Sequence, residues 1–240
     1  MTAKHVVVTG AAGGIGRWMV RDLVDEGFAV TAMDMSGERL DELASEFPSV
    51  SRVACDVTDS DQVADAVDRA VADRGEIFGL VNLAGTNKLQ PLGQITDDDW
   101  RFIIDANLTS AFYLCRAVVP HMTAGDARIV NTSSIFGIRG ADYDVHYSAA
   151  KAGVVGLTRA LATELARSNI TVNCVAPIVV LTERVKKMPE EHLAIQKARI
   201  PLGRFSSEQD VTGTVLFLLG ERGAFYTGQT FSPNGGDTMP

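Results

Sequence analysis

Short apolar runs alternate with helical stretches along the whole chain, and this order restricts the fold more than any other feature of the sequence. The predicted strands are residues 5–8, 28–33, 50–55, 78–83, 127–132, 170–175 and 229–231. The predicted helices are a stretch ending near residue 26 and residues 38–46, 60–74, 100–121, 147–166 and 210–219. Strands such as Val6-Val7-Val8 are apolar throughout, which indicates a sheet covered on both faces. The order therefore predicts an α/β fold of the Rossmann type, with a doubly wound parallel sheet of about seven strands and helices on both faces.

The composition narrows the class of protein. No Pro/Ser-rich linker or charge run divides the 240 residues, so residues 1–240 are expected to form one domain. The chain has 22 basic and 30 acidic residues, a net charge of −8. Such a surface repels phosphate backbones and anionic lipid, so neither nucleic acid nor membrane is expected as a partner. No apolar run reaches the roughly 18 residues of a membrane span, and no leader precedes the first strand, so we expect a cytoplasmic protein.

The cysteines and histidines do not form the spacings of a metal site. Cys55, Cys115 and Cys174 stand apart among apolar neighbours, without a CxxC pair, and the four histidines include no i,i+4 pair. Buried packing is the better interpretation of the cysteines, and no metal is predicted.

A glycine-rich turn joins the first strand to the first helix, at residues 9–16 (TGAAGGIG). Small residues there let the backbone approach a pyrophosphate, whose charge would face the free N–H groups of the helix start, although a tight turn alone would also use glycine. Asp34 ends the second strand about 20 residues later, where a carboxylate can bind ribose hydroxyls and repel a 2′-phosphate. The turn residues 11–13 and Met35 are not basic, and Arg39 is expected on the exposed face of the next helix. The sequence therefore favours NAD over NADP.

Further motifs follow in a fixed order, and with them the chain resembles the short-chain dehydrogenases/reductases in their single-domain form. Besides the turn, the resemblance rests on CDVTD at 55–59, NLAG at 82–85, Asn107 in DANLTSAF, NTSS at 131–134, YSAAK at 147–151, VNCVAP at 172–177 and NGG at 234–236.

The resemblance implies a set of cofactor-binding residues. Asp56 and Val57 would flank the adenine, Asn82, Ala84 and Gly85 would line the cofactor channel, and Thr182 would bond the carboxamide or the pyrophosphate. The full set is Gly10, Gly14, Ile15, Gly16, Asp34, Asp56, Val57, Asn82, Ala84, Gly85, Tyr147, Lys151, Pro177, Val180 and Thr182. One departure is Ile178, where the family usually has glycine, so the loop on the nicotinamide side is expected to differ locally.

Tyr147 and Lys151 are four residues apart on one predicted helix, so their side chains share a face. An ammonium beside a phenol lowers the phenol pKa from about 10 and makes it a usable acid or base. The resemblance implies that Tyr147 exchanges the proton, that Lys151 also binds the nicotinamide ribose and that Ser134 holds the substrate oxygen. It also implies that Asn107 anchors a water that relays protons. As an isolated pair, Tyr147 and Lys151 could equally lie on a solvated helix face; their occurrence with the other motifs favours catalysis.

Four neighbouring polar residues receive lesser roles. Ser133 is the less favoured catalytic serine, and His146 is expected to be structural or to line the pocket. Asp142 and Asp144 are interpreted as loop acids that could meet polar substrate groups.

These residues predict an NAD-dependent oxidoreductase that interconverts a secondary alcohol and a ketone. One alternative is a 3-oxoacyl-thioester reductase; by the resemblance, the acyl-carrier enzymes usually prefer NADP and carry a basic patch before the fifth strand. Residues 123–126 contain no Lys or Arg. The other alternative is a non-catalytic NAD-binding protein, against which the complete catalytic set argues.

A substrate lid is expected at about 183–205. It mixes apolar residues with a basic set of Arg184, Lys186, Lys187 and Lys197. A pair of amphipathic helices with solvated lysines is the favoured interpretation, and an anionic substrate steered by the basic set is the alternative.

The two long predicted helices carry small and apolar residues on more than one side. These residues are Ala106, Ala111, Phe112 and Ala117 on the first helix and Val154, Val155, Leu157, Ala160 and Leu161 on the second. A wide apolar surface implies burial against a second partner, and relatives of the resembled family pair these helices, so a homotetramer is expected.

Overall fold

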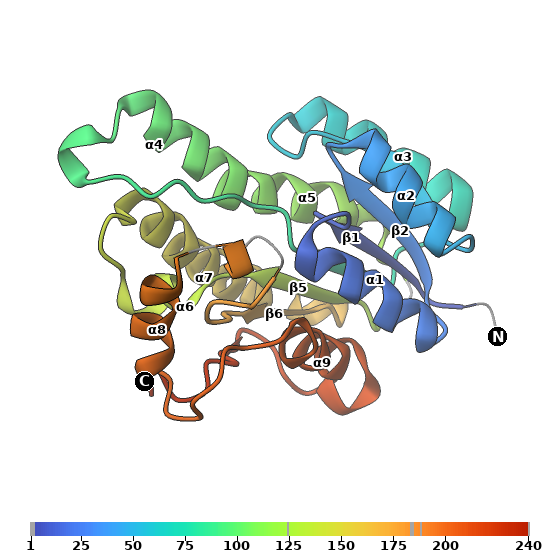
Figure 1. The fold of residues 1–240 in the computed structure, drawn as a ribbon. Coiled ribbons are helices and arrows are strands. Elements are labelled where there is room, and N and C mark those ends of the chain that lie inside the picture. The colour runs from blue at the N-terminus through green and yellow to red at the C-terminus, as the bar shows by residue number, and fades with distance from the viewer. Residues whose placement is uncertain (1–2, 124, 183–184, 188, 240) are drawn as a thin grey trace.

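A computed structural model describes residues 3–123, 125–182, 185–187 and 189–239. Within them, seven parallel strands form one sheet in the order β3-β2-β1-β4-β5-β6-β7, with helices on both faces (Figure 1). The strands are β1 (His5–Thr9), β2 (Ala29–Asp34), β3 (Ser51–Ala54), β4 (Gly79–Asn82), β5 (Arg128–Thr132), β6 (Thr171–Val175) and β7 (Thr230–Phe231). The predicted α/β doubly wound fold is confirmed, and the strand order reverses between β1 and β4, where such sheets bind ligands.

The α-helices are α1 (Gly14–Asp25), α2 (Gly37–Glu46), α3 (Ser60–Arg74), α4 (Asp97–Ile104), α5 (Ser110–Val118), α6 (Ile135–Arg139), α7 (Val145–Leu165), α8 (Glu190–Ala198) and α9 (Glu208–Leu219). Two layers of buried apolar side chains hold six of these helices against the sheet. Helices α1, α2 and α9 pack on one face, and α3, α5 and α7 pack on the other.

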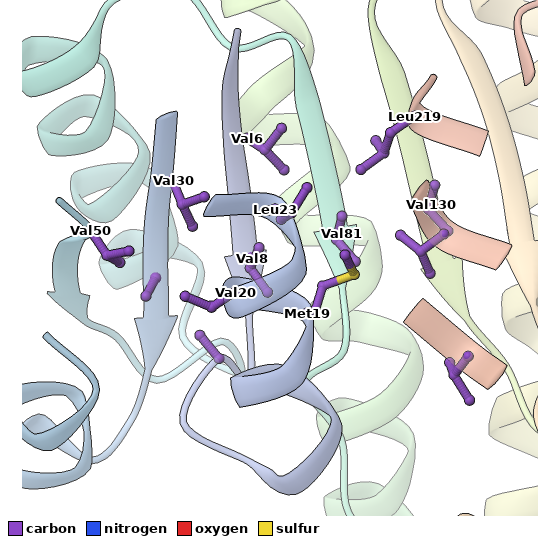
Figure 2. Close-up of a cluster of buried hydrophobic side chains, with 14 of the residues drawn as sticks. Val6, Val8, Met19, Val20, Leu23, Val30, Val50, Val81, Val130 and Leu219 are labelled. Atoms are coloured by element: carbon purple, nitrogen blue, oxygen red, sulfur yellow. The ribbon is translucent and has the colours of Figure 1, made fainter. Parts of the chain in front are cut away.

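Strand β1 shows why the three central residues of a strand covered on both faces are apolar. Val6 and Val8 contribute to the first layer, which includes Met19 and Leu23 of α1, and Figure 2 shows these side chains together. Val7 belongs to the second layer, on the opposite face. Successive side chains of a strand point to opposite faces, and here both faces are covered. An apolar residue is therefore favoured at each of these positions, whichever face it points to.

The predicted helix 100–121 is divided into two α-helices by a π-helical turn over Asp105–Thr109. It begins earlier, because Thr96 caps α4 by accepting a hydrogen bond from the Asp99 N–H at 3.1 Å. A π-helical turn holds one extra residue and often marks a functional site, and this one contains Asn107. By length and composition alone, residues 97–121 could cross a membrane; 44% of the apolar window is buried inside the structure, and a single such helix is weak evidence for a membrane span.

Two short helices were not predicted as separate elements with their own bounds. Helix α6 has five residues, too few for a helical period to be recognised, and α8 lies inside the predicted lid. The prediction that the three cysteines are buried is confirmed.

Candidate active site

The glycine-rich turn brings the start of α1 against the end of β4. Gly10 has a left-handed backbone, with φ of 62°, and a Cβ there would lie 2.9 Å from the backbone of Ala84. A Cβ at Gly16 would lie 2.1 Å from the carbonyl oxygen of Gly10, so only glycine permits this packing. Helix α1 begins after Gly13 with no side-chain cap and no acidic residue in its first turn. Its free N–H groups therefore suit a pyrophosphate.

Asp34 is buried at the carboxyl end of β2 and organises the next turn. Its carboxylate accepts hydrogen bonds from the Ala12 N–H at 3.2 Å and the Ser36 N–H at 3.1 Å. It also accepts one from Arg39 Nη2, at 3.2 Å. Arg39 is exposed, as predicted, but it is also paired with Asp34, an ion pair that the sequence analysis did not foresee. The carboxylate that would meet the adenosine ribose thus has a guanidinium beside it.

The serine and the tyrosine that were predicted to be catalytic belong to α6 and α7, two helices that pack closely on each other. Ser134 is the N-cap of α6, and its Oγ accepts a hydrogen bond from the Phe136 N–H at 3.2 Å. Gly137 permits the packing, since a Cβ there would lie 2.7 Å from the Lys151 carbonyl carbon. Ser133 donates from Oγ to the Lys151 carbonyl oxygen at 2.7 Å. Ser133 is therefore engaged in joining β5 to α7, which agrees with its lesser role.

Lys151 is buried one turn after Tyr147 on the same helix. Its Nζ donates to the Thr132 carbonyl oxygen at 2.8 Å and lies 5.6 Å from the centre of the Tyr147 ring. Burial lowers the pKa of Lys151 to about 8. The geometry places an ammonium beside the phenol, as the spacing of the two residues predicts.

Asn107 lies in the π-helical turn and faces the same region. Its Nδ2 donates to the carbonyl oxygens of Thr86 at 2.8 Å and Ile103 at 2.9 Å. Its Oδ1 is buried and has no partner among the described residues. A Cβ on Gly85 would lie 2.5 Å from this Oδ1 and 3.5 Å from Lys151 Nζ, so the backbone at Gly85 lies between the two side chains.

A small cavity adjoins Asn107, lined also by Thr9, Asn82 and Thr132. Its volume of about 10 Å³ is close to the minimum for one water molecule. An unpaired amide oxygen at its wall is suited to hold that water.

A ladder of buried amides and hydroxyls connects the strand ends. Asn82 Nδ2 donates to Asn131 Oδ1 at 2.8 Å, and Asn131 Nδ2 donates to Thr158 Oγ1 of α7 at 3.1 Å. The sequence analysis quoted Asn131 only as part of a motif and did not single out Thr158. The signal that could have found them is a polar residue in an otherwise apolar strand, since buried amides need partners.

The remaining predicted cofactor residues lie around the same edge. Asp56 Oδ1 accepts from both the N–H and the hydroxyl of Thr58. Val57 packs beside the second apolar layer, and Ile15 packs beside the first. The loop after β6 returns to the turn at the start of α1, because a Cβ on Gly14 would lie 2.9 Å from the Thr182 side chain.

Ile178, which was expected to alter the loop after β6, is buried. Ile178 is buried with Ile135 and Ile200, so its side chain fills a small apolar cluster. The Pro177 carbonyl oxygen accepts from the Ile135 N–H at 3.0 Å, and Val180 forms a bridge with Ser206. Within the lid, Arg184 and the side chain of Lys187 lie outside what the structure describes, whereas Lys186 and Lys197 are exposed.

The sequence described the environment of the polar residues just before Tyr147 only in part. Asp142 is an exposed loop acid, as expected. Asp144 is the last residue of the same loop, at the N-cap of α7, but it is buried, which the sequence did not indicate. Its Oδ2 accepts a hydrogen bond from Asn87 Nδ2 at 3.0 Å. Burial raises the pKa of Asp144 to about 6. His146 is also buried, as a structural residue would be, and burial lowers its pKa.

Together these residues supply the groups that hydride and proton transfer with a nicotinamide cofactor would need. A glycine-lined, uncapped helix start, a ribose-facing carboxylate and the unpaired Asn107 oxygen fit a nicotinamide dinucleotide. Ser134, Tyr147 and Lys151 lie on α6 and α7 at the same carboxyl edge of the sheet.

Comparisons with known proteins agree with this arrangement. A family model described as enoyl-(acyl carrier protein) reductase matches residues 10–238. A 3-oxoacyl-[acyl-carrier-protein] reductase of Thermotoga maritima is 38% identical over 241 residues, with 98% of both chains covered. An acetoacetyl-CoA reductase of an Acinetobacter species is 36% identical over 240 residues, with 97% of both covered. A Brucella melitensis structure described as a short-chain dehydrogenase/reductase, glucose/ribitol dehydrogenase, superimposes with a TM-score of 0.94 at 30% identity over the full length of both.

Proposed function

The chain belongs to the short-chain dehydrogenase/reductase family, and on that premise we propose that it reduces the 3-oxo group of an acyl thioester to a hydroxyl group. The sequence analysis favoured a general secondary-alcohol dehydrogenase and kept the thioester as its alternative. The names of two relatives that match nearly the full chain favour the alternative, since both describe reductases of 3-oxoacyl thioesters. The observation that carries the reaction class is the placement of Ser134, Tyr147 and Lys151 at one edge of the sheet.

In this proposal the chain's own residues bind the ketone and deliver the proton. The Ser134 hydroxyl donates a hydrogen bond to the carbonyl oxygen and holds it near the Tyr147 hydroxyl. When bound, the reduced nicotinamide supplies the hydride to the carbonyl carbon. Tyr147 gives its proton to the same oxygen, which becomes the hydroxyl. The Lys151 ammonium stabilises the phenolate left behind, and a water held by Asn107 Oδ1 returns a proton through Lys151.

For the cofactor we propose NAD(H). The buried Asp34 carboxylate, held by two backbone N–H groups, would accept from ribose hydroxyls and repel a 2′-phosphate. Its pairing with Arg39 weakens that repulsion without removing it, because the guanidinium is half exposed and screened by solvent. We propose a cytoplasmic location, in keeping with a soluble cofactor.

The carrier of the acyl group is best tested directly. The segment before β5 carries Asp126, which pairs with Lys4 at 2.7 Å. An aspartate at this position does not attract an acidic carrier protein. We therefore propose that coenzyme A thioesters are accepted. Purified enzyme should consume NADH on addition of acetoacetyl-CoA and form 3-hydroxybutyryl-CoA in equal amount.

The same assay includes carrier-protein thioesters, and simple secondary alcohols and polyols are tested in the oxidising direction, with NAD in place of NADH. Turnover of polyols or simple alcohols alone would restore the broader interpretation, which Asp34 and the neighbour described as a glucose/ribitol dehydrogenase support. Cofactor binding without turnover of any of these substrates would favour a non-catalytic NAD-binding protein.

A further inference from the structure

Asp144 occupies a helix N-cap but does not cap the helix. Aspartate is among the residues that cap helices best, by accepting a hydrogen bond from an N–H of the first turn. At α7 no such bond forms. The fully buried carboxylate instead accepts from Asn87 Nδ2, 57 positions earlier in the chain, at 3.0 Å. A local bond is thus replaced by a long-range one, three residues before Tyr147.

The partner, Asn87, lies in the loop that carries the cofactor channel. That loop follows β4 and contains Gly85, whose backbone lies between Asn107 and Lys151. A second bond supports the link, because the Gln90 N–H donates to the Tyr143 carbonyl oxygen at 2.8 Å. Tyr143 adopts a left-handed backbone, with φ of 61°, which is unfavourable for a residue other than glycine. The link therefore holds the chain in an unfavourable conformation just before the catalytic helix.

The other side of the loop is fixed to α4. Lys88 Nζ donates to Asp99 Oδ1 at 2.6 Å, and Gln90 Nε2 donates to Asp99 Oδ2 at 2.9 Å. These bonds hold the pKa of Asp99 well below its ordinary value. The loop is thus tied to α4 on one side. On the other side it is tied to the start of α7 by the Asn87–Asp144 side-chain bond, beside the Gln90–Tyr143 backbone bond.

The Asn87–Asp144 pair also has an unfilled acceptor on each partner. Asn87 Oδ1 and Asp144 Oδ1 are both buried, and neither has a hydrogen-bond partner among the described residues. One proton on Asp144 would supply a donor that an amide oxygen can accept, as in a two-bond amide–acid pair. The titratable groups of the surrounding elements are His146 on α7, Lys88 in the loop and Asp99 on α4.

We propose that Asn87 and Asp144 are positioning residues for Tyr147, which lock the cofactor-channel loop to the first turn of α7 and so fix the catalytic phenol. This inference rests on the proposed reductase chemistry for its kinetic consequence. Neither residue needs to touch the substrate, and their effect passes through Tyr147 and the Gly85 backbone.

Variants that remove the link between Asn87 and Asp144, keep it, or exchange its two groups test the proposal. Asn87→Ala and Asp144→Ala should each lower kcat by about tenfold to a hundredfold, because small misplacement of a catalytic group has that effect. KM for NADH should stay within about twofold, since the pyrophosphate and ribose contacts remain. Asp144→Asn keeps an acceptor for Asn87 Nδ2 and a donor for its Oδ1, so it should retain kcat within about threefold.

Exchanging the two groups gives a readout that a merely structural role would not change. Asn87→Asp places two carboxylates at the link, so its kcat should be low near pH 8 and recover partly toward pH 6, where the pair can share a proton. The double variant Asn87→Asp/Asp144→Asn restores one acid and one amide and should recover kcat near pH 8. A double variant no better than Asn87→Asp, or an Asn87→Ala enzyme with wild-type kcat, would overturn the proposal.

The matched control is Asp22→Asn, which weakens a side-chain link between α1 and α9, where Asp22 accepts from Thr212. It should leave kcat unchanged even if it lowers Tm. Hydrogen exchange separates this inference from the proposed function. If the wild type turns over no 3-oxoacyl thioester, the proposed function fails, whereas the link is still supported if residues 83–90 and 143–148 exchange faster in Asn87→Ala but not in Asp22→Asn. Unchanged exchange in Asn87→Ala would contradict the link itself.

Discussion

At the scale of single residues, Asp34 carries the proposed choice of cofactor, and Arg39 modifies it. The carboxylate is buried and held by backbone N–H groups, so it cannot turn away from a 2′-phosphate without losing those bonds. Arg39 reaches it from the first turn of α2. The sequence showed both residues but could not show their contact, because the direction of a long exposed side chain depends on the turn between them.

We predict that the wild-type enzyme prefers NADH and that Asp34→Ala raises kcat/KM for NADPH about tenfold, or roughly 1.4 kcal/mol. The substitution removes a repulsion and frees Arg39 for the phosphate. Adding Arg39→Ala should reverse part of the gain. Asp41→Ala is the control, since Asp41 pairs with Arg52 on the exposed side of α2. Preference for NADPH in the unmodified enzyme would show that the role assigned to Asp34 is wrong.

At the scale of elements, the packing of α6 on α7 decides whether the catalytic group assembles. Gly137→Ala would place its Cβ 2.7 Å from the Lys151 carbonyl carbon and 2.8 Å from the Ala152 nitrogen, so α6 must shift. Because Ser134 caps α6, we predict that kcat falls by at least about tenfold while NADH affinity changes little. Gly213→Ala on α9 meets nothing within 4 Å and should leave kcat unchanged while raising stability by up to about 1 kcal/mol. Steady-state kinetics beside thermal unfolding test this, and wild-type kcat in Gly137→Ala would refute it.

Asp144, at the start of α7, should also make the free energy of unfolding depend on pH. Asp144 has its pKa raised from 3.8 to about 6, so the folded chain binds this proton more tightly than the unfolded chain does. The free energy of unfolding should therefore fall as pH rises from about 4 to about 6 and change no further above that. Relative to Asp144→Asn, which has no such proton, the wild type should lose up to about 3 kcal/mol between pH 4 and pH 7. Denaturant unfolding across this range measures the difference, and a difference independent of pH would exclude Asp144 as its source.

The element scale also shows how far the sequence could predict this molecule. The seven strands and most helices were predictable because each carries an apolar pattern of sufficient length, with errors of at most three residues at the ends. The division of residues 97–121 by a π-helical turn could not be predicted, because one extra residue hardly alters an apolar pattern. Motif order predicted Ser134, Tyr147 and Lys151, but Asp144 was missed because burial of a carboxylate depends on a partner far away in the chain.

At the scale of the whole molecule, the apolar residues of the two long helices divide into two groups. Ala106, Ala111 and Val154 are buried within the single chain, so their part in the argument for assembly was wrong. Phe112 remains exposed, at 41%, together with Trp100 at 42% and Phe102 at 55% on α4. We propose that these aromatic side chains of α4 and α5 form a contact between copies of the chain.

We predict a homotetramer in solution, with a mass near four times the 25.7 kDa of the chain. Phe112→Glu should lower that mass by placing a charge in the contact, while thermal unfolding confirms that each chain remains folded. Light scattering at micromolar concentration distinguishes these states. A wild-type mass near that of one chain would contradict the assembly.

The central claim is that Tyr147 transfers the proton in the reduction of a 3-oxoacyl thioester, and one comparison tests it most directly. Acetoacetyl-CoA and NADH are incubated with wild type and with Tyr147→Phe, and the 3-hydroxyacyl product is quantified against NADH consumed. The account predicts equal amounts of the two in the wild type. It predicts a loss of about 10²- to 10⁴-fold in kcat for Tyr147→Phe, with nearly unchanged NADH affinity, because only the proton donor is removed. Wild-type turnover in Tyr147→Phe would contradict the account.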